Sequence, residues 1–257
     1  MSVPLRVLWP ADRAGQVVEP DDAEPVLADL YAYPGGSSRW VRANMVSTLD
    51  GAASGGDGRS GSINTPADFR VFVLLRALAD VVLAGAGTVR AERYGLPRAR
   101  PALAARRQSA GQDDAPLLAV VTRSGRVPTD QGLFGAERPT LVVTCRAAGD
   151  ETLTRLRDLA GDRHVIVAGD EDVDVPAALD ALGERGFRRV LCEGGPSLLG
   201  AVAAAGCLDE LCLTWSPTLV GGDGPRVVHG PPLTAPMTLV HLLHADDTLL
   251  GRWLRTP

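Results

Sequence analysis

Short apolar runs alternate along the chain with segments of helical spacing. Apolar runs bounded by turn residues predict strands, and apolar residues recurring three or four positions apart predict helices. The predicted strands are Trp40–Thr48, Asp80–Ala84, Leu117–Thr122, Thr140–Thr144, His164–Ala168, Arg188–Cys192 and Glu210–Trp215. The predicted helices are Pro66–Leu78, which Thr65 caps, and Glu151–Leu159, Ala177–Arg185 and Ser197–Ala205. This alternation favours an α/β fold whose largely parallel sheet has helices on both faces.

The remaining segments depart from this alternation. Residues 1–39 are predicted to be an N-terminal extension with one short helix that ends at Gly35-Gly36, so the main domain covers residues 40–257. The segment Arg98–Pro116, rich in Arg and Ala, is predicted to be a mobile surface loop. Near the C-terminus, TLVHLLHADDTLLGRWL predicts an antiparallel hairpin around an Asp-Asp turn.

Composition narrows the function classes. The chain has 257 residues, 45% of them hydrophobic, and a net charge of −5, without a basic run that would grip a nucleic-acid backbone. Its apolar stretches are shorter than a membrane span, and its first residues do not form a secretory signal, so we expect a cytoplasmic protein. All 26 basic residues are Arg. The absence of Lys excludes pyridoxal-phosphate chemistry, a P-loop and the Tyr-x-x-x-Lys site of short-chain dehydrogenases.

Cysteine and histidine provide no metal site by spacing. No C-x-x-C pair is present, so Cys145, Cys192, Cys207 and Cys212 are predicted to be reduced, mostly buried thiols. His241 and His244 are three apart in a predicted strand and therefore point to opposite faces. No metal is expected, and no G-x-S-x-G elbow supports a serine hydrolase.

Three loops at the carboxyl ends of predicted strands have the chemistry of a dinucleotide site. In the first, Gly85 and Gly87 allow close backbone approach to a diphosphate and Thr88 offers a hydroxyl. In the second, Glu193 precedes a Gly-Gly-Pro turn and a helix start, which is an anion site. In the third, Arg123 and Arg126 flank Ser124 and suit a ribose 2′-phosphate. The structural alternatives are a tightly packed glycine turn, an acid that stabilises a helix start, and two solvated arginines.

Four segments together resemble the reductase domain of bacterial riboflavin biosynthesis, the RibD C-terminal type, in the dihydrofolate-reductase-like superfamily. They are VRANMVSTLDG (41–51), INTPADFRVFVLLRALADVVLAGAGTV (63–89), AVVTRSGRV (119–127) and LCEGGPSLLGAVAAAGCLDELCLTWSPTLVGG (191–222). The resemblance implies one dihydrofolate-reductase-like domain. It also implies an NADPH-dependent reductase that converts the ribosyl group of 5-amino-6-(5-phosphoribosylamino)uracil to a ribityl chain. The first forty residues are too short for the zinc deaminase of bifunctional members.

The resemblance also implies roles for individual residues. The implied cofactor contacts are Ser47, Thr48, Gly85, Gly87, Thr88, Glu92, Arg123, Ser124, Gly194, Gly195, Pro196, Ser197, Leu198 and Leu199. The implied substrate contacts are Asn44, where bifunctional members often have Lys, and Asp50, Ser60, Arg76 and Glu193, with Arg76 reaching the ribose phosphate. A proton would come from Glu193, Asp50 or a bound water. Whether Arg98 or Arg100 also grips the phosphate stays open, as does the turn-forming role of Asp50.

Two other functions fit the same sequence. A cleft that does not grip a ribose phosphate would accept a pteridine and act as a dihydrofolate-reductase-like enzyme. A protein that keeps the fold without turnover would bind NADPH in a regulatory role. In each case we expect a homodimer, with LDELCLTW (208–215) as a candidate interface strand.

Overall fold

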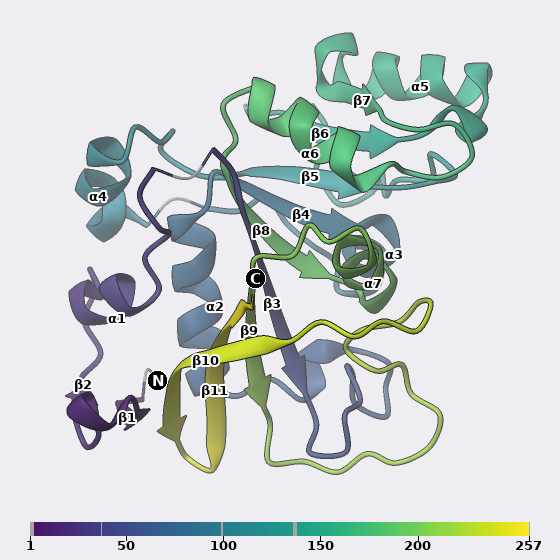
Figure 1. Ribbon diagram of the computed structural model, residues 1–257. Coiled ribbons are helices and arrows are strands. Elements are labelled where there is room, and N and C mark those ends of the chain that lie inside the picture. Colours follow the sequence, from purple (N-terminus) through teal and green to yellow (C-terminus); the bar gives the residue numbers. More distant parts are fainter. Residues whose placement is uncertain (1–2, 37, 99, 136–137, 257) are drawn as a thin grey trace.

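One eleven-stranded sheet forms the centre of the molecule (Figure 1). The structure is a computed structural model that describes residues 3–36, 38–98, 100–135 and 138–256. The strand order is β2-β1-β10-β11-β9-β3-β8-β4-β5-β6-β7. The strands are β1 (Leu5–Trp9), β2 (Val17–Val18), β3 (Trp40–Ser47), β4 (Val81–Gly85), β5 (Leu117–Val121), β6 (Thr140–Thr144), β7 (Val165–Val167), β8 (Arg189–Gly194), β9 (Glu210–Trp215), β10 (Met237–Ala245) and β11 (Thr248–Arg255).

The centre of the sheet is parallel and one side is antiparallel. Neighbouring strands from β9 through β3, β8, β4, β5 and β6 to β7 pair in parallel. Strands β11, β10, β1 and β2 continue the sheet antiparallel on the other side of β9. The predicted α/β class, with a mostly parallel sheet and a C-terminal hairpin, is confirmed. The parallel order brings the carboxyl ends of β3, β4 and β8 to one edge, where ligands bind in such sheets.

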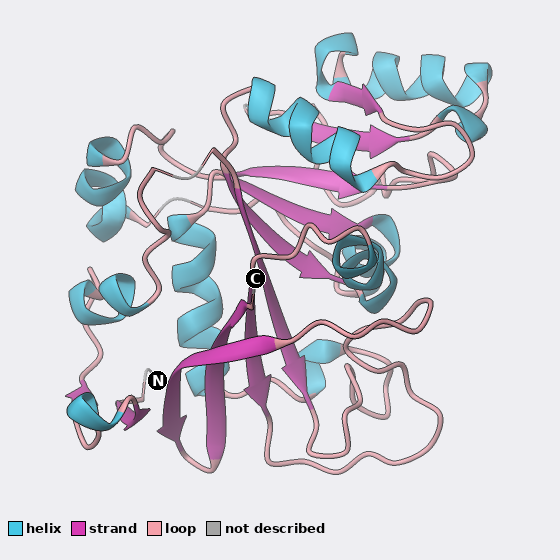
Figure 2. Cartoon of the chain, viewed as in Figure 1, coloured by secondary structure: helices cyan, strands magenta, loops and turns pink. Residues whose placement is uncertain are grey.

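Helices cover both faces of the sheet (Figure 2). They are α1 (Pro25–Leu30), α2 (Pro66–Leu78), α3 (Ala86–Ala91), α4 (Ala104–Ser109), α5 (Asp150–Ala160), α6 (Val175–Glu184) and α7 (Pro196–Ala204). Because side chains alternate along a strand, Val82 of β4 joins a core with α1 and α2, whereas its neighbour Leu83 joins a core with α6 and α7. Strand β4 is therefore buried on both sides, which explains its continuous apolar run.

Helix α2 begins as the sequence predicts. The Thr65 hydroxyl accepts a hydrogen bond from the Asp68 backbone N–H at 3.2 Å, and Pro66 occupies the first helical position. The helix ends at Leu78. Its buried side includes Leu74 and Leu75, whereas Phe69 remains 58% exposed.

The N-terminal segment contains the predicted short helix, α1, and also adds two strands, β1 and β2, to the central sheet. Strand β1 pairs with β10, and β2 pairs with β1. Arg70 of α2 fixes this segment, because its guanidinium pairs with the buried carboxylate of Glu24 at 2.6 Å and donates to the Val3 and Val18 carbonyl oxygens. The sequence signal for β1 is the alternation of apolar Leu5 and Val7 with Arg6, and both apolar side chains are buried.

The prediction of a mobile loop over 98–116 is wrong. This segment contains α4, and its Arg107 is 2% exposed. The Arg107 guanidinium donates to the carbonyl oxygens of Ala77 and Ala79, each at 2.8 Å, and to that of Asp113 at 2.7 Å. The side chain thus satisfies carbonyl groups at the end of α2, and this anchors a stretch whose composition is typical of a loop.

Candidate active site

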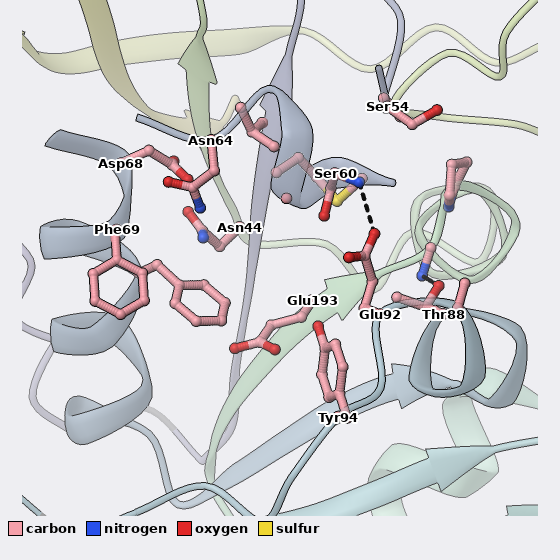
Figure 3. Close-up of a pocket in the computed structure, with 18 of the residues that line it drawn as sticks. Asn44, Ser54, Ser60, Asn64, Asp68, Phe69, Thr88, Glu92, Tyr94 and Glu193 are labelled. Carbon is pink, nitrogen blue, oxygen red and sulfur yellow. Dashed lines mark hydrogen bonds between the residues drawn. The ribbon is translucent and has the colours of Figure 1, made fainter. Parts of the chain in front are cut away.

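The main cavity, of about 1020 Å³, opens where β3, α2, α3 and β8 meet (Figure 3). Of the predicted substrate contacts, Asn44, Ser60, Arg76 and Glu193 line it. They come from β3, the loop before α2, α2 itself and β8, so the fold brings together residues far apart in the sequence. Among the predicted cofactor contacts, Gly87, Thr88, Glu92, Gly195 and Pro196 line the same cavity.

An ion pair between Glu193 and Arg76 lies inside this cavity. Arg76 Nε donates to Glu193 Oε1 at 2.6 Å and Nη2 donates to Oε2 at 2.7 Å, a bidentate arrangement. The Glu193 side chain is 2% exposed and that of Arg76 is 19% exposed. Burial lowers the pKa of Arg76, but hydrogen bonding and charge from Glu193 outweigh it, so its pKa is raised. The two predicted substrate contacts therefore hold each other.

Aromatic side chains surround this pair. The Arg76 guanidinium carbon lies 4.2 Å from the Phe72 ring centroid and 5.0 Å from that of Tyr94. Burial, followed by the negative charge of Glu193, raises the pKa of Tyr94, so the phenol stays neutral. Phe72 and Tyr94 were not predicted as site residues, because the spacing of Phe72 is that of a helix core and Tyr94 lies outside the segments that carry the resemblance.

Two hydrogen bonds join the loops around the cavity. The Gly195 N–H donates to the Thr88 hydroxyl oxygen at 2.7 Å, and the Ser60 N–H donates to Glu92 Oε1 at 2.7 Å. A Cβ atom on Gly195 would lie 2.5 Å from that same hydroxyl oxygen. Glycine is therefore required where the start of α7 approaches α3. Thr88 and Glu92 hold neighbouring loops as well as facing the cavity.

Asp50, predicted to be a substrate contact or a turn-forming residue, is held by hydrogen bonds at the end of β3. Thr48 donates its hydroxyl to Asp50 Oδ1 at 2.5 Å, and the Gly221 N–H donates to Oδ2 at 2.7 Å. These hydrogen bonds, with Thr48 contributing most, lower the pKa of Asp50, which lies outside the residues that line the cavity. The Ser47 hydroxyl is buried and donates to the Thr48 carbonyl oxygen at 2.8 Å. Asp50 thus binds the 216–221 segment to the turn after β3.

A second cavity, of about 640 Å³, adjoins the first, and Gly87 lines both. The predicted residues Gly85, Arg123, Ser124, Ser197 and Leu198 line it. Arg90 and Arg126 also line it, and Arg90 donates to the Arg126 carbonyl oxygen at 3.0 Å. Sequence reasoning missed Arg90, which follows the first glycine loop by one helical turn. The guanidiniums of Arg90, Arg123 and Arg126 give this cavity a cationic wall. The carboxylates of Asp172 and Asp174 also line the cavity.

Arg98 and Arg100 line neither cavity. Arg70 and Arg93 line the main cavity instead. Arg70 pairs with Glu24. Arg93 is exposed and has a positive φ of 50°.

Asp68 is the main site residue that the sequence analysis missed. It lines the main cavity from the first turn of α2 and is 3% exposed. Burial raises its pKa to about 6, against a smaller effect of the Thr214 hydroxyl. An acid in the first turn of a helix ordinarily stabilises the helix dipole, which is why the sequence alone did not single it out.

The histidines and cysteines line neither of these two cavities. His241 is 1% exposed and packs edge-on against Tyr31, and burial lowers its pKa to about 3. Cys145, Cys192 and Cys212 are buried free thiols. Among the residues that the structure describes, no cluster of His, Cys, Asp and Glu has the arrangement of a metal site. Within the same residues, no helix has the length and apolar character of a membrane span.

The family model described as the RibD C-terminal domain matches residues 39–250. The chain belongs to this family. Within it, the chain is 32% identical to a protein of Archaeoglobus fulgidus named 2,5-diamino-6-ribosylamino-4(3H)-pyrimidinone 5′-phosphate reductase, over 74% of this chain and 86% of that one. The match to the riboflavin biosynthesis protein RibD of Bacillus amyloliquefaciens is 28% identical and covers 82% of this chain but 55% of that protein.

A solved structure supports the same assignment. The crystal structure of a pyrimidine reductase-like protein from Corynebacterium diphtheriae superposes with a TM-score of 0.80 at 25% identity. The superposition covers 90% of this chain and 98% of that one. The parallel order of β8, β4 and β5 brings the three glycine and arginine loops to one edge of the sheet. A nicotinamide cofactor is implied for this reductase family.

Proposed function

We propose that this chain is an NADPH-dependent reductase of riboflavin biosynthesis that reduces the ribosyl group of a phosphoribosylaminopyrimidine to a ribityl chain. The observation that carries the proposal is the Glu193–Arg76 pair inside the main cavity, beside a second, cationic cavity with which it shares Gly87. The names of its relatives support this substrate class. The relative from Archaeoglobus fulgidus is named for a diaminopyrimidinone phosphate, whereas the sequence resemblance suggests the corresponding uracil.

The residues around the two cavities fit a dinucleotide. A Cβ atom on Gly85 would contact the Gly194 carbonyl oxygen, and the Gly195 N–H donates to the Thr88 hydroxyl, so the first glycine loop lies against the start of α7. The nine-residue helix α7 begins at Pro196 and directs backbone N–H groups and its positive dipole end toward this place. We assign the diphosphate to residues 194–199 and the 2′-phosphate end to Arg123 and Ser124 with Arg90 and Arg126. This cationic wall favours NADPH over NADH.

When bound, the reduced nicotinamide supplies hydride to the substrate. The chain positions the reactants and excludes water. Arg76, held between Phe72 and Tyr94, fixes the Glu193 carboxylate and offers its remaining N–H groups to the substrate phosphate. A bound water supplies the proton to the nitrogen or oxygen atom of the opened ribosyl group, and the Glu193 carboxylate accepts a hydrogen bond there and so positions that proton. We prefer Glu193 to Asp50 for this role because Asp50 is occupied by Thr48 and Gly221 outside the cavity.

The test is NADPH consumption by the purified chain with three substrates in parallel: the diaminopyrimidinone phosphate, 5-amino-6-(5-phosphoribosylamino)uracil, and dihydrofolate. We expect turnover of at least one ribosylated pyrimidine, weaker activity with NADH, and none with dihydrofolate. Turnover of dihydrofolate alone would establish a pterin reductase. NADPH binding without turnover of any of the three would establish a non-catalytic role.

We also propose a homodimer, formed through the face of β9 rather than its edge. Strand β9 lies inside the sheet between β11 and β3, so its backbone is already paired. Leu211, Leu213 and Trp215 alternate with buried residues and remain half-buried, next to Trp253 of β11. Light scattering on the purified chain should give twice the mass of one chain, and Leu213→Glu should halve it.

A further inference from the structure

One end of the main cavity contains polar groups of β3, α2 and the segment before α2. Asn44, Asn64 and Asp68 gather there, near the Phe69 ring (Figure 3), and Phe69 stacks with Phe72, which lines the same cavity. Glu193, which pairs with Arg76, lines the same cavity. A planar ring with polar edges fits such an end, because amides and a carboxylate read hydrogen-bonding groups at its rim while aromatic rings contact its face.

Asp68 differs from the other acids at the site because it has no arginine partner. Within the described residues, no salt bridge includes Asp68, and its helix neighbour Arg70 is occupied by Glu24. A carboxylate that is 97% buried and lacks a counter-charge costs free energy, since burial penalises the ionised form. A ligand that donates hydrogen bonds into this place would offset that cost.

We propose that Asp68 recognises the amino-pyrimidine edge of the substrate, accepting hydrogen bonds from the 2-amino group and ring N3–H, and thereby selects the 2,5-diaminopyrimidinone over the uracil. This inference rests on the proposed function. The two rings differ at position 2, where the diaminopyrimidinone has an amino donor and the uracil a carbonyl acceptor. An ionised carboxylate only accepts hydrogen bonds. It therefore pairs with two parallel N–H groups of the diaminopyrimidinone but faces the carbonyl oxygen of the uracil.

The two asparagines do not make this distinction. An amide offers both donors and acceptors, so Asn44 and Asn64 can serve either ring. The selection therefore depends on Asp68 and on its charge. A site built to bind an N–H group rejects a ligand that lacks it by several orders of magnitude, because the buried polar group is left unpaired.

The experiment compares Asp68→Asn with the unaltered chain in kcat/KM for the two ribosylated pyrimidines. We expect the unaltered chain to prefer the diaminopyrimidinone by at least about 100-fold. The asparagine amide offers one acceptor and one donor, which matches N3–H and the 2-carbonyl of the uracil, so Asp68→Asn should remove or reverse the preference. Asp158→Asn, the same change on the exposed side of α5, should leave the ratio as it was.

Equilibrium binding separates this inference from the proposed function. Calorimetry with 2,5,6-triamino-4(3H)-pyrimidinone and 5,6-diaminouracil measures ring recognition without turnover. Preference for the triamino compound that Asp68→Asn abolishes supports the inference, even if neither ribosylated substrate is reduced and the proposed function fails. Equal binding of the two rings, or a preference unchanged in Asp68→Asn, overturns the inference while leaving the reductase function to the turnover assay.

A second measurement needs no variant. The preference of the unaltered chain should weaken as the pH falls below about 6, because a protonated Asp68 becomes a donor as well as an acceptor. The other charged side chains lining the cavity are Arg70, Arg76, Glu92, Arg93 and Glu193, whereas Asn44 of β3 and Thr214 of β9 are neutral. The Asp68→Asn ratio serves as the pH control. A preference that is the same at pH 5 and pH 8 would overturn the inference.

Discussion

Glu193 and Glu210 are both buried carboxylates held by arginine, yet their surroundings differ. Glu210 accepts hydrogen bonds from Arg42 at 2.6 and 3.1 Å, from Arg252 at 2.8 and 3.1 Å, and from the Trp40 indole at 2.9 Å. Its side chain and that of Arg42 are fully buried. Glu193 has one arginine, and that arginine is partly open to the main cavity.

The difference distinguishes an ion pair of the core from one of the site. The protein fills the hydrogen-bonding capacity of Glu210, so no place remains for a ligand. Burial alone would raise the pKa of Glu210, but the charges and hydrogen bonds of Arg42 and Arg252 lower it to about 2. Glu193 and Arg76 keep free positions that face the cavity, and these a substrate can occupy.

The largest expected effect is on the core ion pair. Glu210→Gln keeps the shape of the side chain but leaves two buried guanidiniums without a counter-charge. We expect a loss of about 3–5 kcal/mol in the free energy of unfolding, measured by urea denaturation. Glu184→Gln, at the exposed end of α6, is the matched control and should change it by less than about 0.5 kcal/mol. A loss below about 1 kcal/mol in Glu210→Gln would mean that the core pair is no different from a surface pair.

The corresponding change in the site should affect catalysis instead. Glu193→Gln removes the carboxylate to which we assign the positioning of the proton, so kcat/KM should fall by about 100- to 10,000-fold. Its free energy of unfolding should change by less than about 1 kcal/mol, because the cavity lets water reach Arg76. Steady-state turnover and urea denaturation on the same sample test both parts. A variant as unstable as Glu210→Gln would show that Glu193 is structural.

Acid should weaken the core pair within a defined pH range. Because the pKa of Glu210 is lowered from 4.5 to about 2, its contribution is present above pH 4.5 and is lost as the pH falls toward 2. This lowering corresponds to about 3 kcal/mol. The difference in unfolding free energy between the unaltered chain and Glu210→Gln should therefore shrink over that range. A difference that stays constant from pH 6 to pH 3 would contradict the assignment.

Asp68 should show the opposite sign from Glu210, with a smaller effect. Its pKa is raised to about 6, so its contribution to stability is present at low pH and is lost as the pH rises through about 6. Asp68→Asn removes the buried charge and should stabilise the ligand-free chain by about 1–2 kcal/mol at pH 8. Thermal unfolding at pH 5 and pH 8 measures the effect. Destabilisation at pH 8 would show that Asp68 supports the fold rather than a ligand.

The sequence predicted the parts of the molecule that depend on local pattern. The strand and helix alternation, the Thr65 cap, the C-terminal hairpin and the glycine loops all follow from periodicity and turn residues. Arg123 and Ser124 line the same cavity because they are neighbours along the chain. These features need no knowledge of which strands are adjacent in the sheet.

The sequence could not predict what depends on the order of the strands. Arg76 and Glu193 are 117 residues apart, and the packing of α2 against β8 brings them together. The raised pKa of Asp68 comes from its burial at the cavity wall. The buried position of Arg107 depends on carbonyl groups at the end of another helix. In each case a side chain that is ordinarily solvated takes its role from a tertiary partner.

Helix α2 carries Asp68 and Arg76 toward the cavity, and its Arg70 also reaches the carbonyl oxygens of Val3, Val18 and Glu19. The N-terminal segment therefore serves as a foundation for the helix. A protease cut that released the residues before Glu24 would remove these carbonyl oxygens. The buried Arg70 guanidinium would then lose three of its hydrogen-bond acceptors. Loss of β1 and β2 would therefore disturb the main cavity through α2, although none of the residues of these two strands lines it.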